Sequence, residues 1–241
     1  MTVRSELRAG GLLAAVLART EAWLFHPVGS DRIEAAPPPP PRPVVAVRGL
    51  VAGCGTSMIA RGLAAVLASA DPRGAAAVAG SVRGAGLKLG APGAARLARE
   101  LTGLGCDGVR PAGRLCLIPV GEPLARAAAE RPCPLVLDVA ASSPPAEGLG
   151  LADHVVLVAA ADAEPSIAAA VAGSLARAGR SVDVVVNRVE ERGGMDWPAG
   201  SIEVAEARFA AQLALACQGA RAALARPLAE LAARCRARAP G

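Results

Sequence analysis

The chain has 241 residues, a formal net charge of +5, no tyrosine and an aromatic content of 2%. So few aromatic side chains argue against single-stranded nucleic-acid binding by base stacking, and no long block of like charges marks a nucleic-acid tail. The six cysteines include no C-x-x-C pair and no histidine at zinc-ligand spacing, which excludes a zinc motif and indicates reduced thiols. The length suffices for one α/β domain with a full core.

The N-terminal segment, residues 1–33, is predicted to be helical over residues 4–25. Its apolar residues recur at helical spacing at Leu13, Val16, Leu17 and Leu24. Its arginines and glutamates nearly balance, which favours a protein partner for this helix over direct contact with anionic lipid. The segment has no convincing cleavage site, and no stretch reaches the roughly 18 apolar residues of a spanning helix. We therefore expect a cytoplasmic protein that reaches a membrane only through a partner.

Residues 34–43 (EAAPPPPPRP) predict an extended polyproline linker, which is followed by the main domain, residues 44–238. In that domain, short apolar runs alternate with helical patterns. The predicted strands are 44–47, 75–80, 114–120, 134–140, 154–160, 182–189 and 201–204. The predicted helices are 56–70, 94–104, 122–130, 165–178, 205–218 and 228–237. This alternation predicts an α/β fold, a doubly wound and mostly parallel sheet with helices on both faces, and a site at the carboxyl ends of the strands.

The stretch LVAGCGTSM (residues 50–58), after the first predicted strand, has the form of a phosphate-binding loop. Gly53 and Gly55 let backbone N–H groups curl around an anion, and the N-terminus of the following helix adds partial positive charge. The hydroxyl of Ser57 stands where such loops bind magnesium. Thr56, however, replaces the lysine that neutralises the phosphates.

Two later strands also end in polar residues. Asp138 ends the run CPLVLD, where it is either a magnesium-binding acid or a strand-end cap, and Asn187 with Arg188 ends the run VDVVVNR. Asn187 also suits a turn after a strand. Residues 80–82 (GSV) follow the second predicted strand and supply no acid to orient a nucleophile.

The order of these pieces over residues 44–236 resembles the MinD/ParA family of P-loop ATPases, the deviant-Walker-A proteins of the SIMIBI class. The resemblance implies a magnesium site at Ser57 and Asp138, and adenine recognition by Asn187 and Arg188. It implies ATP or ADP with magnesium as cofactor, and a homodimer as one possible assembly. The implied phosphate contacts come from the loop and the start of its helix, namely Gly53, Cys54, Gly55, Thr56, Ser57 and Met58.

The sequence departs from the family pattern at the charged positions. Thr56 replaces the loop lysine, Val51 replaces the signature lysine that reaches the partner's nucleotide in the family, and residues 80–82 replace the acids after the second strand. Phosphoryl transfer depends on positioned positive charge. We therefore expect no catalytic residue and a pseudo-ATPase that acts as a scaffold or positioning adaptor. Its cargo would belong to cell division, chromosome partition, or placement of a secretion system, pilus or flagellum.

Two alternatives remain open at this stage. A weak but genuine ATPase could use Arg48 or Arg61 in place of the lysine, although both are expected to be solvated. A module that binds an anion or a protein without nucleotide would need no cofactor. We expect His154 to be a structural residue at a strand edge, and the C-terminal stretch 227–241 to dock onto the domain.

Overall fold

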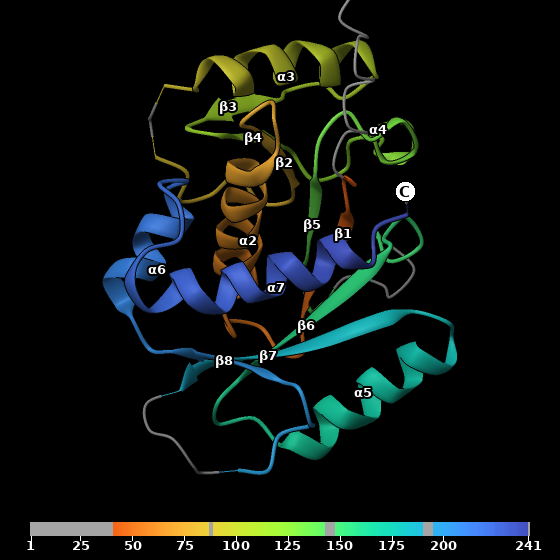
Figure 1. Ribbon diagram of the computed structural model, residues 1–241, viewed down its shortest axis with the longest axis vertical. Coiled ribbons are helices and arrows are strands. Elements are labelled where there is room, and N and C mark those ends of the chain that lie inside the picture. Colours follow the sequence, from red (N-terminus) through yellow and green to blue (C-terminus); the bar gives the residue numbers. More distant parts are fainter. Residues whose placement is uncertain (1–40, 87–88, 143–147, 190–194, 241) are drawn as a thin grey trace, which may run out of the picture. The chain divides into compact units, whose positions relative to one another are not determined.

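The computed structural model describes residues 41–86, 89–142, 148–189 and 195–240 (Figure 1). The predicted N-terminal helix and the linker up to residue 40 lie outside the described residues. Among the helices that the structure describes, none combines the length and apolar character needed to span a bilayer.

An eight-stranded sheet forms the centre of the domain, in the order β3-β4-β2-β5-β1-β6-β7-β8. The outer strand β3 pairs antiparallel with β4, and all other pairs are parallel. The strands are β1 (Val44–Gly49), β2 (Ala76–Ala79), β3 (Arg110–Ala112), β4 (Leu115–Ile118), β5 (Leu135–Val139), β6 (His154–Ala160), β7 (Ser181–Val189) and β8 (Ile202–Ala205).

Helices cover both faces of this sheet (Figure 1). Helices α2 (Thr56–Ala70), α6 (Arg208–Leu215) and α7 (Ala225–Ala237) pack on one face, with a 3-10 turn at Ala222–Leu224 before α7. Helices α3 (Pro92–Gly103), α4 (Ala125–Glu130) and α5 (Pro165–Arg177) pack on the other. The predicted fold class, a doubly wound and mostly parallel sheet between two helical layers, is confirmed.

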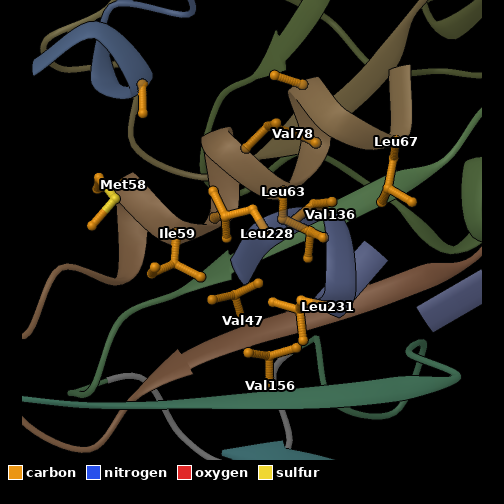
Figure 2. Close-up of a cluster of buried hydrophobic side chains, with 14 of the residues drawn as sticks. Val47, Met58, Ile59, Leu63, Leu67, Val78, Val136, Val156, Leu228 and Leu231 are labelled. Carbon is orange, nitrogen blue, oxygen red and sulfur yellow. The ribbon is translucent and has the colours of Figure 1, made fainter. Parts of the chain in front are cut away.

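The alternation of side chains along β1 explains the two cores. Val45 and Val47 belong to the cluster under α2, whereas Val44 and Ala46 belong to the cluster under α3 and α4. In the first cluster, Leu63 of α2 lies close to Leu228 of α7 above the strand side chains (Figure 2). The C-terminal stretch therefore docks onto the domain as predicted, because its apolar edge is fully buried.

The boundaries of the predicted elements agree with the structure to within three residues, and one strand of the structure is not predicted. Strand β3 is not predicted, because three residues centred on Pro111 carry no strand pattern, and proline is tolerated only at a sheet edge. Helix α6 begins at Arg208, whereas the predicted helix begins at residue 205, because Ala205 still belongs to β8. The six cysteines are all buried and unpaired, and burial raises the pKa of the Cys116 thiol to about 12.

A buried charge network closes the amino ends of β6 and β7. The Asp183 carboxylate accepts hydrogen bonds from Arg234 at 3.0 Å and Arg238 at 2.8 Å, and lies 2.9 Å from His154 Nε2. Burial opposes the ionisation of Asp183, but the hydrogen bonds from His154 and Arg234 outweigh it and lower the pKa of Asp183 to about 2. His154 is the first residue of β6 and bonds Asp183, so its place at the edge of the strand is as predicted, and the structure adds that it is fully buried there.

A second network of arginines and carboxylates anchors the start of the domain at the same end of the sheet. Arg131 makes two hydrogen bonds of 2.6 Å to the Asp153 carboxylate, which also accepts the backbone N–H of Val44. Arg42 pairs with Asp71 at 2.9 Å, and its carbonyl accepts a bond from Arg131. The last residues of the predicted linker are therefore fixed to the base of the sheet.

Candidate functional site at the carboxyl ends of the strands

The loop between β1 and α2 lies at the carboxyl end of the central strand, where open parallel sheets bind ligands. Gly53 and Gly55 both adopt the left-handed conformation, with φ of 80° and 96°, which residues other than glycine rarely adopt. Gly55 also has no room for a side chain, because a Cβ atom there would lie 2.2 Å from the Asn187 amide nitrogen. These two glycines turn the chain from the strand into the helix.

The end of β7 holds two carbonyls of this loop. Asn187 donates its amide N–H to the Cys54 carbonyl at 2.8 Å, and Arg188 donates to the Gly53 carbonyl at 2.8 Å. In a trans peptide the carbonyl and the following N–H point in opposite directions, so the N–H groups of Cys54 and Gly55 point away from β7. Within the described part of the chain, neither these nor the N–H groups of Thr56 and Ser57 find an acceptor.

A cleft of about 480 Å³, here called the loop cleft, opens beside these amides. Its described lining includes no lysine, arginine or histidine, and Asp138 is its only ionisable side chain. The loop contributes Val51, Ala52, Gly53, Gly55, Thr56, Ser57 and Met58, and the neighbouring strands contribute Ser81, Val120, Asp138 and the stretch 140–142. The donors of the loop cleft are therefore backbone N–H groups and hydroxyls.

A second cleft of about 420 Å³, here called the side cleft, lies between the loop and α6. It shares Gly55, Met58 and Leu215 with the loop cleft, so the two clefts adjoin. Asn187 and Arg188 line it from β7. Together the two clefts form a track that runs past the start of α2.

Asp138, near the end of β5, faces the loop cleft. Burial raises the pKa of the Asp138 carboxyl, although a hydrogen bond with Ser57 and the positive charge of Arg61 work in the opposite direction. One hydroxyl and one carboxylate suit magnesium, which takes its remaining ligands from phosphate and water. The described residues include no group of three or more metal-binding side chains.

Comparisons with known proteins identify the fold. No family model matches the sequence, and no curated protein sequence does. A ParA family ATPase from Chlorobium tepidum TLS superposes with a TM-score of 0.58 at 15% identity, over 80% of this chain and 98% of that one. The MinD cell division protein of Aquifex aeolicus gives 0.55 at 14% identity, over 83% and 99%. The septum site-determining protein MinD of Pyrococcus horikoshii OT3, complexed with Mg-ADP, gives 0.52 at 14% identity, over 80% and 95%.

The chain has the fold of the ParA and MinD ATPases. The resemblance inferred from the sequence is thereby confirmed for the fold over most of the chain. Identities this low carry no residue roles, so the chemistry of the site rests on the side chains described here.

Both arginines that could replace the lysine of a ParA or MinD loop bond backbone carbonyls. Arg61 is only 1% exposed and donates to the carbonyls of Ser81, Arg83 and Leu215. Arg48 is partly buried and lies 3.4 Å from the Ala141 carbonyl. The expectation that these arginines are solvated is wrong, because both cross from the sheet or its helix to a neighbouring loop.

The structure brings the predicted site residues together at one end of the sheet. Gly53, Gly55, Thr56, Ser57, Met58 and Asp138 line the loop cleft, and Asn187 and Arg188 line the side cleft. Cys54 belongs to the loop but is buried and does not line either cleft, and its Sγ lies 3.3 Å from the Thr56 hydroxyl. Sequence reasoning did not place Leu215 in the lining of both clefts. It also missed the burial of Arg61, since a lone arginine on a predicted helix carries no signal for a buried position.

Proposed function

We propose that this protein, which has the fold of the ParA and MinD ATPases, does not hydrolyse nucleotide. We propose further that it binds an anionic ligand at the loop cleft and serves as a scaffold or positioning adaptor. The observation that carries the proposal is the loop cleft itself, whose described lining offers N–H donors but no basic side chain. Hydrolysis needs positive charge placed on the transferred phosphoryl group. The amides can hold an anion but cannot replace that charge.

The end of β2 supports the same proposal. Gly80 stands where an acid follows the second strand in the resembling family, and a Cβ atom there would lie 2.6 Å from the Asp138 Cβ. Asp138 therefore fills the space that a side chain at position 80 would need. A side chain at position 80 would therefore require Asp138 to move.

A weak ATPase that uses Arg48 or Arg61 is the less favoured function. The guanidinium of Arg61 already bonds three carbonyls, and reaching a phosphate would leave all three without their donor. A hydrogen bond to a charged group contributes about 1.5–3 kcal/mol, so giving up these bonds would cost stability.

The proposed role as an adaptor rests on the fold and on the predicted N-terminal helix. The MinD of Pyrococcus horikoshii is described as septum site-determining and is complexed with Mg-ADP, which makes ADP or ATP with magnesium the first ligands to test here. We propose that residues 1–33 engage a protein partner through the polyproline linker, and that any membrane association occurs through that partner. A homodimer is a second arrangement to test.

The proposal is tested by measuring phosphate release from ATP with magnesium, for the wild type and for Asp138→Ala. We expect both proteins to release phosphate at the rate of the protein-free control. Turnover by the wild type that Asp138→Ala abolishes would contradict the proposal and support the ATPase alternative.

A further inference from the structure

Helix α5 has an apolar outer surface. It lies on β6 and β7 (Figure 1), and Ala168 is the only one of its residues that is buried. The helix carries no charged residue before Arg177, and its Ile167 is 56% exposed. A surface helix normally turns charged residues to solvent, whereas a helix that is apolar all round is normally covered. The outer side of α5 therefore has the character of a contact surface.

The residues opposite Ala168 form one narrow side of the helix, here called the α5 face. They are Ser166, Ala170, Gly173 and Arg177, which recur at spacings of three or four residues. Ser166, Ala170 and Arg177 are exposed, and Gly173 is partly buried. Because alanine and glycine stand at the centre of the face, a second helix can approach it closely.

A groove of about 590 Å³, here called the α5 groove, lies beside the N-terminal half of this helix. Glu164 and Asp196 are the only charged residues of its described lining, and both are exposed. Neither carboxylate forms an ion pair with a described residue, although Glu164 accepts a hydrogen bond from Ser166. Met195 and Pro198 contribute apolar walls. Such a groove suits an arginine, whose stem packs on apolar side chains while its guanidinium pairs with carboxylates.

The far end of the α5 face supplies an arginine of this kind. Arg177 makes no side-chain hydrogen bond or ion pair within the described part of the chain. Its Nη1 lies 3.6 Å from the position of a Cβ atom on Gly173, so the guanidinium lies along the face. About 20 Å of helix separates Arg177 from Glu164. Within one chain, the arginine therefore cannot reach the groove.

We propose that two copies of this chain form a dimer through α5, with antiparallel helices and Arg177 of each protomer in the α5 groove of its partner. A two-fold interface is self-complementary, so a face with an acidic groove at one end and an arginine at the other fits a second copy of itself. Pairing Ala170 with the partner's Gly173 brings Arg177 beside the partner's Ser166, a residue of the groove. None of these residues lines the loop cleft, so the inference is independent of the ligand proposed there.

Sedimentation velocity on the full-length wild type tests for the dimer, across the micromolar range and without nucleotide. One helix face and one groove make a small protein interface, so we expect a reversible dimer with a dissociation constant of roughly 10 μM. A wild type that stays monomeric throughout this range would overturn the inference. A wild type that dimerises only with ATP and magnesium would also overturn it.

Ala170→Glu tests the place of the contact. The two new carboxylates of a dimer would lie close together near the two-fold axis, so we expect the dissociation constant to rise roughly a hundredfold. Ala95→Glu is the matched control, because Ala95 is an exposed alanine of α3, and it should leave the dissociation constant unchanged. Thermal melts establish that both variants fold. An Ala170→Glu protein that dimerises as the wild type does would overturn the place given to the α5 face.

Two charge reversals test the pairing across the interface. Arg177→Glu and Glu164→Arg each bring like charges together, so we expect each variant alone to dimerise roughly tenfold more weakly than the wild type. In a mixture of the two variants, both contacts join opposite charges at these positions. The heterodimer should therefore form roughly tenfold more tightly than either homodimer. A mixture that associates no better than the separate variants would overturn the place given to Arg177.

Discussion

At the amino ends of β6 and β7, the Asp183 carboxylate meets Arg234, Arg238 and His154, so each oxygen of this buried acid has a partner. At the carboxyl end of β1 the opposite holds, because the loop amides from Cys54 to Ser57 have no acceptor among the described residues. Native proteins pair nearly all buried polar groups. The paired end of the sheet thus contributes to stability, and we propose that the end with free donors receives a ligand.

The largest effect is expected from Arg61→Met, which removes the buried guanidinium that bonds three carbonyls at the carboxyl ends of the strands. Three carbonyls, of Ser81, Arg83 and Leu215, would lose their donor, and we expect a loss of about 4 kcal/mol in the free energy of unfolding. Urea denaturation measures it. Arg61→Lys can keep some of these hydrogen bonds, so its free energy of unfolding should fall less. An Arg61→Met protein as stable as the wild type would show that these hydrogen bonds do not stabilise the domain.

The next largest effect is expected from Asp183→Asn at the paired end. The substitution leaves Arg234 and Arg238 without their buried counter-charge, so we expect a loss of about 3 kcal/mol in the same measurement. Glu230→Gln is the matched control, since Glu230 pairs with the same Arg234 but its side chain is 53% exposed. That control should lose no more than about 0.5 kcal/mol, and equal losses would mean that burial of the network adds nothing.

The pH dependence of stability measures the contribution of the Asp183 carboxylate to the free energy of unfolding. The pKa of Asp183 is about 2 in the folded protein against an ordinary 3.8, so its stabilisation is present above the ordinary value and is lost as the pH falls through 2. The amount is about 2 kcal/mol. Urea midpoints of the wild type should therefore fall more steeply than those of Asp183→Asn between about pH 4 and pH 2, and parallel curves would contradict the assignment.

The smallest effect is expected from Val51→Lys at the end with free donors. Val51 is 51% exposed in the loop, so the free energy of unfolding should change by no more than about 0.5 kcal/mol. We also expect no gain of ATP hydrolysis, because Thr56 and Gly80 remain unchanged. A phosphate-release assay measures this, and turnover restored by this one lysine would contradict the view that several elements are missing.

The sequence predicts the loop at the carboxyl end of β1 better than the charge network around Asp183. The alternating apolar runs predict seven of the eight strands, and the start of α2 at Thr56 follows from the glycine before the helical pattern. The loop glycines, Ser57 and Asp138 are also found at one end of the sheet as predicted. The partners of His154 and Arg61 could not be predicted, because their contacts join segments that only the packed fold brings together.

The central claim is that the free loop amides receive a ligand, and it is tested most directly by nuclear magnetic resonance. ADP, and in a separate experiment ATP, would be added to nitrogen-15-labelled wild type while the backbone N–H resonances are followed. We predict that the resonances of Cys54, Gly55, Thr56 and Ser57 move most, and that those around Asp183 stay in place. Unchanged loop resonances at saturating concentrations of both nucleotides would contradict the account.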